Sequence, residues 1–288
     1  MQKMNKKMTG LKLAGMLVLG SVFSGATSAG QLYFNGFETD VAGWNAFGGA
    51  FDATRVATGT SGITSATGAW HAESSTQGSA GNWGGYNYGA GNAVPTAFQP
   101  YSTTVDIYLD VAGGWANDTR FDFDSAINNA NGTFLRDFIF NAGFYNDTDG
   151  SPGSGTSRFV VSASNNSQPG SAYAKNPARN PIAISTTGWY TFQHEFYESG
   201  GFLYVDMNIL DSASVLVNSW TLGGTDAIAG VGGNRYGWFS YNQFSTLALD
   251  NSELRVADAT TPTPTTLALI GLGVAGLGFK RRKLTILS

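Results

Sequence analysis

The chain has 288 residues, a formal net charge of −4 and no cysteine, so disulfides, thiol chemistry and cysteine-ligated metal sites are excluded. Eight of its 16 basic residues lie near the two ends, within residues 3–12 and 280–283, and all 20 acidic residues lie between them, so the middle of the chain carries a charge of about −12. Such an acidic body repels phosphate backbones, which argues against nucleic acid as a partner.

Residues 1–29 have the pattern of a secretory signal peptide, which we expect to form a short helix. Four lysines precede an apolar stretch from Leu13 to Phe23, and small residues follow it. Thr27 and Ala29 occupy the −3 and −1 positions for signal peptidase, which predicts cleavage after Ala29; Ala26 offers a second cleavage position. An uncleaved anchor is the alternative, but the apolar core is short and is interrupted by glycine. The leader therefore predicts export.

The body, residues 30–258, is predicted to be one all-β domain, a two-sheet antiparallel sandwich of the jelly-roll, concanavalin-like kind. Apolar and polar residues alternate from Thr103 to Val111, as is typical of a half-buried strand. Two more alternating runs flank the turn at 199–201 and predict a β-hairpin. Further strand candidates are residues 31–37, 69–73, 134–144, 157–163, 214–222, 235–241 and 246–257. Many short strands separated by glycine- and asparagine-rich loops favour a sandwich.

A Pro/Thr-rich linker, residues 259–266, leads into an apolar segment at 267–279. As a helix these 13 residues reach roughly 20 Å, which is short of the 30 Å or so of a bilayer's hydrocarbon core. A basic cluster follows and would remain cytoplasmic. It consists of Lys280, Arg281, Arg282 and Lys283. The pattern predicts a short C-terminal transmembrane helix that acts as a temporary membrane stop, with a permanent transmembrane helix as the alternative.

The end of the chain resembles a known sorting signal. Pro262, Thr263 and Pro264, then the apolar segment and the basic cluster, resemble the PEP-CTERM sorting signal over residues 261–283, although threonine stands where the family's name implies glutamate. The resemblance implies an exported bacterial protein whose tail is cut by an exosortase, a membrane-embedded protease or transferase. The precursor would be bound transiently to the inner membrane, and the product would reach the cell envelope, outer surface or extracellular matrix.

Two phrases of the body resemble the opening and closing strands of exported jelly-roll domains of the lectin and laminin-G-like group. They are "LYFNGFETDVAGWNAF" at 32–47 and "LALDNSELRVAD" at 247–258. This resemblance implies a sandwich that binds carbohydrate and holds a structural calcium near its ends, which would involve Glu38 and Asp250.

A glycine-rich loop combines aromatic rings with amides. Aromatic faces suit the C–H side of a sugar and amides bind its hydroxyls, so the loop predicts a site for an extracellular polysaccharide. The alternative is a loop that folds its own aromatic rings onto the sandwich. The candidate residues are Asn82, Trp83, Tyr86, Asn87 and Tyr88, with Trp115 in a second loop.

A second loop gathers hard oxygen donors. Asn146, Asp147 and Asp149 precede Gly150, which permits the sharp bend of calcium loops, so calcium is the one cofactor that the sequence indicates. The alternative is a solvated Asp/Gly turn.

No catalytic residues are predicted. The single-strand E-x-D-x-x-E arrangement of retaining glycosidases is absent, and Glu195 and Glu198 lie three apart on a strand, so they point to opposite faces. His194 shares the apolar side of its strand and is expected in the core. We therefore expect a non-catalytic surface or matrix protein that binds carbohydrate. A secreted glycoside hydrolase, with catalytic residues from separate strands, and a purely structural matrix component are the alternatives.

Overall fold

Antiparallel β-strands are the main elements of the chain that the computed structural model describes, which is residues 30–46, 52–74, 78–82, 96–165 and 173–256. These residues belong to one unit, Ser28–Ala259. The strands are β1 (Gly30–Asn35), β2 (Asn45–Ala46), β3 (Ala53–Ala57), β4 (Trp70–Ser74), β5 (Ala80–Asn82), β6 (Tyr101–Leu109), β7 (Thr119–Asn129), β8 (Phe134–Tyr145), β9 (Arg158–Asn165), β10 (Ile182–Ile184), β11 (Gly188–Ser199), β12 (Phe202–Asp211), β13 (Leu216–Ala227), β14 (Val231–Asn242) and β15 (Leu247–Val256). Three short 3-10 helices are η1 (Thr60–Gly62), η2 (Pro177–Arg179) and η3 (Ile228–Gly230).

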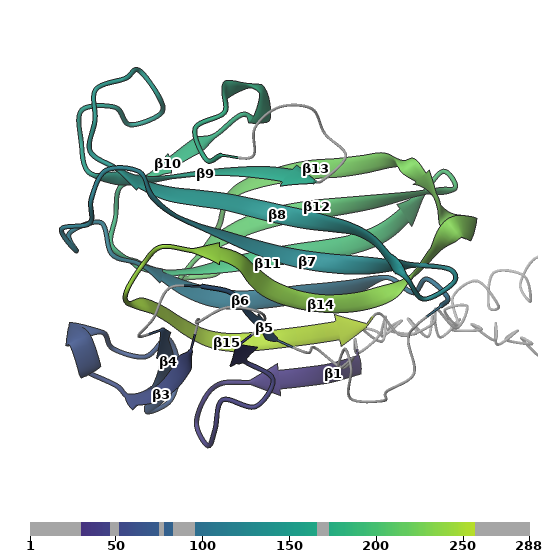
Figure 1. The fold of residues 1–288 in the computed structure, drawn as a ribbon, viewed down its shortest axis with the longest axis horizontal. Helices are drawn as coiled ribbons and strands as arrows, with labels where there is room; N and C mark the ends of the chain where they lie inside the picture. The colour runs from purple at the N-terminus through teal and green to yellow at the C-terminus, as the bar shows by residue number, and fades with distance from the viewer. Residues whose placement is uncertain (1–29, 47–51, 75–77, 83–95, 166–172, 257–288) are drawn as a thin grey trace, which may run out of the picture. The chain divides into compact units, whose positions relative to one another are not determined.

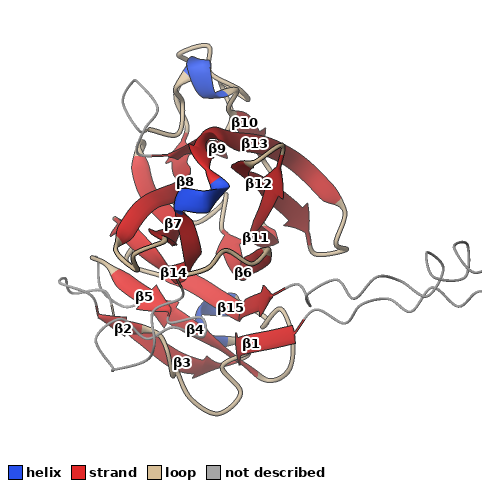
Figure 2. Ribbon diagram, turned by 90° about the vertical axis from the view of Figure 1, so that its right-hand side faces the viewer, coloured by secondary structure: helices blue, strands red, loops and turns tan. Residues whose placement is uncertain are grey.

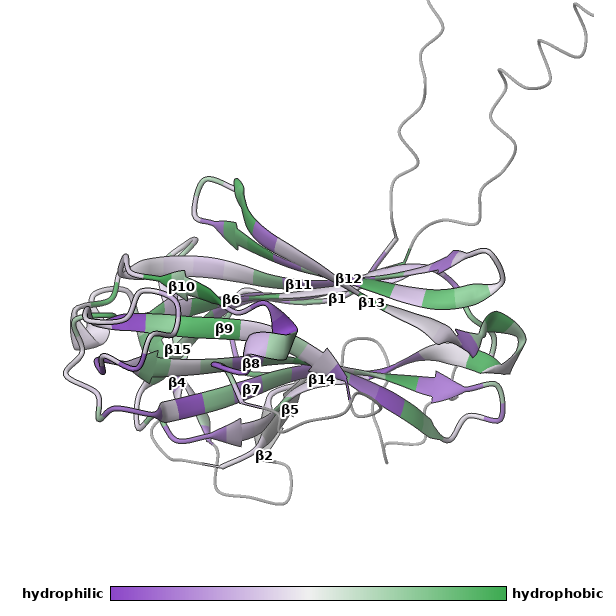
Figure 3. Cartoon of the chain, turned by 90° about the horizontal axis from the view of Figure 1, so that it is seen from above, coloured by the Kyte–Doolittle hydropathy of each residue, from purple (hydrophilic) through white to green (hydrophobic). Residues whose placement is uncertain are grey.

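The strands form two sheets that pack face to face (Figures 1 and 2). An eight-stranded sheet has the order β13-β12-β11-β6-β15-β4-β3, with β1 also paired to β15. A seven-stranded sheet has the order β10-β9-β8-β7-β14-β5-β2. Figure 3 shows the two layers from above, with hydrophilic and hydrophobic residues interspersed along the strands. The predicted all-β, two-sheet antiparallel sandwich is confirmed.

The predicted helices of the leader and the tail lie outside the described residues. In the part of the chain that the structure does describe, no helix has the length and apolar character needed to span a bilayer.

The first and last strands of the body are neighbours. Gly30 of β1 lies opposite Val256 of β15, and the start of β15 pairs with β4 through Leu247 and Ser74. The opening and closing strands that the sequence indicated therefore lie side by side, and the body begins and ends at one place.

The predicted hairpin is formed by β11 and β12. Ser199 lies opposite Phe202, and the two residues between them, Gly200 and Gly201, have φ angles of 60° and 85°. A two-residue turn with positive φ at both positions matches the right-handed twist of the flanking strands, which is why glycine is needed here. The alternation predicted for β6 is also observed, because Val105 and Ile107 are fully buried.

The core between the sheets is built largely from phenylalanine. Phe192 of β11 meets Phe121 of β7 edge-on at 6.0 Å and Phe140 of β8 at 5.1 Å, measured between ring centroids. Such edge-to-face pairs add to the stabilisation from burial itself. In a chain without disulfides, this packing is the main source of stability.

One polar seam crosses this core. The imidazole of His194 is fully buried, and its Nε2 donates to the carbonyl of Phe138 in the other sheet at 3.1 Å. Beside it, the hydroxyl of Thr103 donates to Ser125 across the sheets at 3.1 Å. Burial lowers the pKa of His194 to about 3. The predicted core location of His194 is confirmed, and the ring is neutral at ordinary pH.

We expect His194 to make the fold sensitive to acid. In the unfolded chain His194 binds a proton near pH 6.5, whereas in the folded protein it binds one only near pH 3. The contribution of neutral His194 to the free energy of unfolding is therefore complete above pH 6.5 and is lost as the pH falls. Relative to His194→Gln, the wild-type free energy of unfolding should fall by up to about 1.4 kcal/mol per pH unit between pH 6 and pH 4. Urea denaturation of both proteins across this range measures the difference, and parallel pH profiles would contradict it.

Candidate functional site

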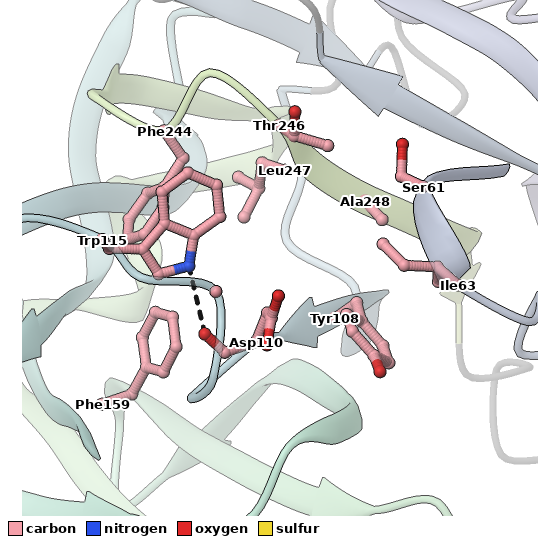
Figure 4. A pocket seen from close by; sticks show the side chains of 11 residues that line it. Ser61, Ile63, Tyr108, Asp110, Trp115, Phe159, Phe244, Thr246, Leu247 and Ala248 are labelled. Atoms are coloured by element: carbon pink, nitrogen blue, oxygen red, sulfur yellow. Dashed lines mark hydrogen bonds between the residues drawn. The ribbon is translucent and has the colours of Figure 1, made fainter. Parts of the chain in front are cut away.

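A small pocket lies where strands of both sheets end. It is formed by η1, the end of β6 with the loop that follows it, the start of β9, and the loop from β14 into β15 (Figure 4), and has a volume of about 190 Å³. Pockets that enclose a drug-sized ligand are larger, roughly 300–1,000 Å³, so this one suits a single small ring or the end of a chain. It is lined by Ser61, Ile63, Tyr108, Asp110, Gly113, Trp115, Phe159, Phe244, Thr246, Leu247 and Ala248.

Trp115 forms an aromatic wall of the pocket. Its indole nitrogen donates to the carbonyl of Asp110 at 3.1 Å, and its ring stands edge-on to Phe244 at 5.0 Å. A Cβ at Gly113 would come within 2.6 Å of the indole nitrogen, so glycine is required for this close approach. The indole is therefore held in one orientation before any ligand arrives.

Polar groups share the pocket with this wall. Figure 4 shows the carboxylate of Asp110 between Trp115 and Tyr108, with the hydroxyls of Ser61 and Thr246 also on the lining. One oxygen of Asp110 accepts from the backbone of Ala112 at 3.0 Å, which fixes the carboxylate. Burial, and then the charge of Asp110, raise the pKa of the Tyr108 phenol, which therefore remains a donor at neutral pH. The pocket thus combines an aromatic wall with donors and acceptors.

A buried network holds the η1 side of the pocket. Ser61 donates to Glu73 at 3.0 Å, the other Glu73 oxygen lies 3.3 Å from His71 Nε2, and His71 Nδ1 lies 3.0 Å from the hydroxyl of Ser65. The arrangement has the composition of a nucleophile, base and orienting acid. However, Ser65 does not line the pocket and His71 is fully buried, so we assign the network to positioning η1.

Among the described residues that were predicted to bind sugar, Trp115 lies in this pocket. Trp83, Tyr86, Asn87 and Tyr88 lie outside the described residues. Asn82 is the last residue of β5, opposite Gly237 of β14. The glycine-rich loop therefore remains a prediction.

The predicted calcium loop holds a lysine. Lys175 Nζ donates to Asp147 at 2.7 Å and to Asp149 at 2.6 Å, and fully buried Arg158 pairs with Asp147 at 3.1 Å. Hydrogen bonds from Lys175 lower the pKa of both carboxyls. The backbone of Asn146 donates to Asn117. An ammonium group therefore occupies the place between the carboxylates where a metal would bind, and with Lys175 in this position the loop does not fit calcium.

Glu38 and Asp250 do come close to the same segment of chain, but each binds backbone N–H groups. Glu38 accepts from Ala69 at 3.0 Å and Trp70 at 3.1 Å, and Asp250 accepts from Thr67 at 3.1 Å. Burial raises the pKa of Asp250 to about 6. Across the described ranges, no group of three or more His, Asp or Glu side chains is arranged to hold a metal ion. These two carboxylates tie residues 67–70 to the opening and closing strands.

Three carboxyl groups that the sequence did not bring together share one face of the seven-stranded sheet. Asp124 of β7 lies opposite Ile139 of β8, and Asp137 lies opposite Ala126, so Asp124 and Asp137 are diagonal neighbours, with Asp122 two residues along. Burial raises the pKa of all three; it brings Asp137 to about 6, and the charge of Asp137 raises Asp124 further. This carboxyl face lies opposite the side of β7 that packs in the core.

Comparison with known proteins identifies the tail. The family described as the PEP-CTERM protein-sorting motif matches residues 260–283. The chain carries a PEP-CTERM sorting motif. The match spans Thr263 and confirms the sorting signal predicted at 261–283. This motif is recognised by exosortases, and it marks an exported protein whose precursor is anchored in a membrane.

The remaining comparisons add little. No curated protein matches the chain. A solved structure that is similar is the CBM2 module of the evolved Dit of Lactobacillus casei BL23 phage J-1, with a TM-score of 0.38 and 11% identity, covering 80% of this chain and 97% of that one. At this distance the similarity says nothing about a ligand.

Lys175 provides a test of the calcium prediction. We expect millimolar calcium to leave the melting temperature of the wild type unchanged, because Lys175 and Arg158 together already neutralise both carboxylates. Lys175→Ala leaves Arg158 as the remaining cation beside Asp147 and Asp149, so one negative charge is uncompensated and calcium should raise the melting temperature by roughly 2–4 °C over an EDTA control. Lys175→Arg keeps the charge and should behave as the wild type. A calcium-dependent shift in the wild type that Asp149→Asn abolishes would contradict this assignment.

Proposed function

We propose that this exported protein is a non-catalytic carbohydrate-binding component of the cell envelope or extracellular matrix, with the Trp115 pocket as its binding site. The observation that supports the proposal is the pocket itself, in which a fixed indole stands beside a fixed carboxylate and several hydroxyls. An indole presents an apolar face to the C–H side of a sugar ring, while Asp110 and Tyr108 can exchange hydrogen bonds with its hydroxyls.

The size and charge of the pocket narrow the class of ligand. A volume of about 190 Å³ accommodates one ring, so the terminal or a single exposed sugar of a polymer is the unit bound. Asp110 has no basic residue beside it in the lining, so neutral or amino sugars fit better there than acidic sugars. One small ring contributes little free energy, and we expect affinities in the millimolar range, raised when many copies face one polymer.

The two ends of the chain support the proposed location. Signal peptidase would remove the leader after Ala29, and an exosortase would replace the apolar segment 267–279 with an anchor. The body would then face the polysaccharides of the envelope or matrix, which are the partners proposed for the pocket.

The proposal is tested by glycan binding. We expect the wild type to bind neutral glycans on an array and by isothermal titration, and Trp115→Ala to weaken the binding at least tenfold because the aromatic wall is lost. Phe202→Ala is the matched control, since Phe202 is 40% exposed at the far end of a hairpin and does not line the pocket. Equal loss in both variants, or no binding by the wild type, would reject the pocket and favour a purely structural role.

The carboxyl face supports a second candidate function, a glycoside hydrolase. Such enzymes need one carboxyl that keeps its proton near neutral pH and a second that is ionised. Burial raises the pKa of Asp124 well above its ordinary range and brings the pKa of Asp137 to about 6, so Asp124 holds its proton more tightly and Asp137 ionises first. Asp124 and Asp137 come from adjacent strands, so a motif on a single strand could not reveal the pair.

Reducing-sugar release measures this second function. If the face is catalytic, Asp137→Asn should lower the rate at least 100-fold, because the carboxylate that ionises near neutral pH is lost. Asp118→Asn is the matched control; Asp118 is exposed and has a φ of 68°, which asparagine tolerates. The absence of activity in the wild type across matrix polysaccharides would leave the binding function alone.

A further inference from the structure

A second hollow lies at the open side of the sandwich, away from the residues of the Trp115 pocket. Figures 1 and 2 show β9, β10 and β13 running along this side, where the edge strands of the two sheets meet. The groove, which we name the Arg179 groove, has a volume of about 350 Å³. Its polar lining comes from Arg179 at the end of η2, from Asn180 directly after it, and from Asn218, Ser219 and Thr221 on β13. It shares no lining residue with the Trp115 pocket.

Arg179 is buried in this groove without a carboxylate. The residue is 7% exposed, and its NH1 reaches the carbonyl of Ala163 at 3.5 Å, which is a long contact. Its Nε has no hydrogen-bond partner among the residues that the structure describes. No ion pair joins it to an acidic residue within the described ranges. By contrast, buried Arg158 pairs with Asp147 and donates to several other oxygens. A desolvated guanidinium costs free energy unless an anion or several acceptors satisfy it.

The guanidinium is also held in place. Asn176 caps η2 by accepting from the backbone of Ala178 at 3.1 Å, and Asn180 ends it in the left-handed region with a φ of 48°. The carbonyl of Asn180 then accepts from the indole of Trp220 on β13 at 3.0 Å. The turn that carries Arg179 is thereby fixed to the opposite sheet, so the groove is formed in advance.

We propose that the Arg179 groove binds the carboxylate of an acidic sugar, a uronate unit of a polysaccharide. The planar fork of a guanidinium matches one carboxylate through two parallel hydrogen bonds. The amide of Asn218, which lies on the same face of β13 as Trp220, suits a hydroxyl of the same ring. A single positive group on a body of about −12 favours a singly charged ligand over phosphate, which carries more charge. This inference rests on the proposed carbohydrate binding and adds a class of sugar to it.

The experiment compares one oligomer in two chemical forms. The full chain is titrated by calorimetry with trigalacturonate and with its methyl ester, which has the same rings without the charges. We expect the acid to bind at least tenfold more tightly than the ester, and Arg179→Gln to remove that preference. Arg179→Lys keeps the charge but loses the fork and should fall between the two. Equal binding of acid and ester, or an unchanged preference in Arg179→Gln, overturns the inference.

Further controls separate the possible failures. Removing an unpaired buried charge should leave the melting temperature of Arg179→Gln equal to or above that of the wild type, and a large decrease would show that Arg179 is structural, which also overturns the inference. Trp115→Ala should bind trigalacturonate as the wild type does, because the sites share no residue. If Trp115→Ala loses neutral-glycan binding while the wild type binds trigalacturonate no more tightly than its methyl ester, the proposed function is retained and the Arg179 groove is rejected as a uronate site. Inorganic phosphate or a peptide carboxylate that binds more tightly than trigalacturonate rejects the uronate assignment.

Discussion

The two sheets depend on a neutral imidazole at the centre of an aromatic core. His194 donates to a backbone carbonyl of the facing sheet, and Thr103 and Ser125 make a second contact beside it, so the sheets are joined by directional bonds as well as by ring packing. Hydrophobic burial alone does not fix how far one sheet slides over another, whereas a buried hydrogen bond does, because breaking it leaves an unsatisfied group. The seam therefore helps set how the strand ends and the edge strands of the two sheets meet, and the ends form the pocket while the edges form the groove.

The acidic groups of the body are used mainly to fix loops. Asp40 accepts from the backbone of Ala42, Asp110 from Ala112, and Asp250 from Thr67, while Asp147 pairs with basic side chains. The charge of each of these carboxylates is thus compensated by nearby N–H groups. A count of acidic and basic residues does not show this compensation. The large negative charge of the body consequently serves the geometry of its loops as well as its solubility.

The sequence predicts the fold better than it predicts the sites. Alternation revealed β6 and the β11–β12 hairpin, because the period of two survives wherever one face is buried. The strand β7 was not predicted, because only two apolar residues, Phe121 and Phe123, alternate with Asp122 and Asp124 before the pattern ends. Lys175 lies 26 residues from Asp149 and could not be paired with it by spacing. The lack of an acidic partner for Arg179 among the described residues depends on how the chain folds around it, so no sequence pattern could have predicted it.

The place of β15 bears on how an anchored body carries load. Its last residue, Val256, is paired with Gly30 of β1 on one side and with Tyr101 of β6 on the other, and the sorting motif begins a few residues further on. A pull transmitted through the tail would run along a strand bonded on both flanks, so the bonds would be sheared together rather than opened one at a time. A surface protein tethered through such a strand resists drag from flow or from a sticky polymer better than one held by an edge strand.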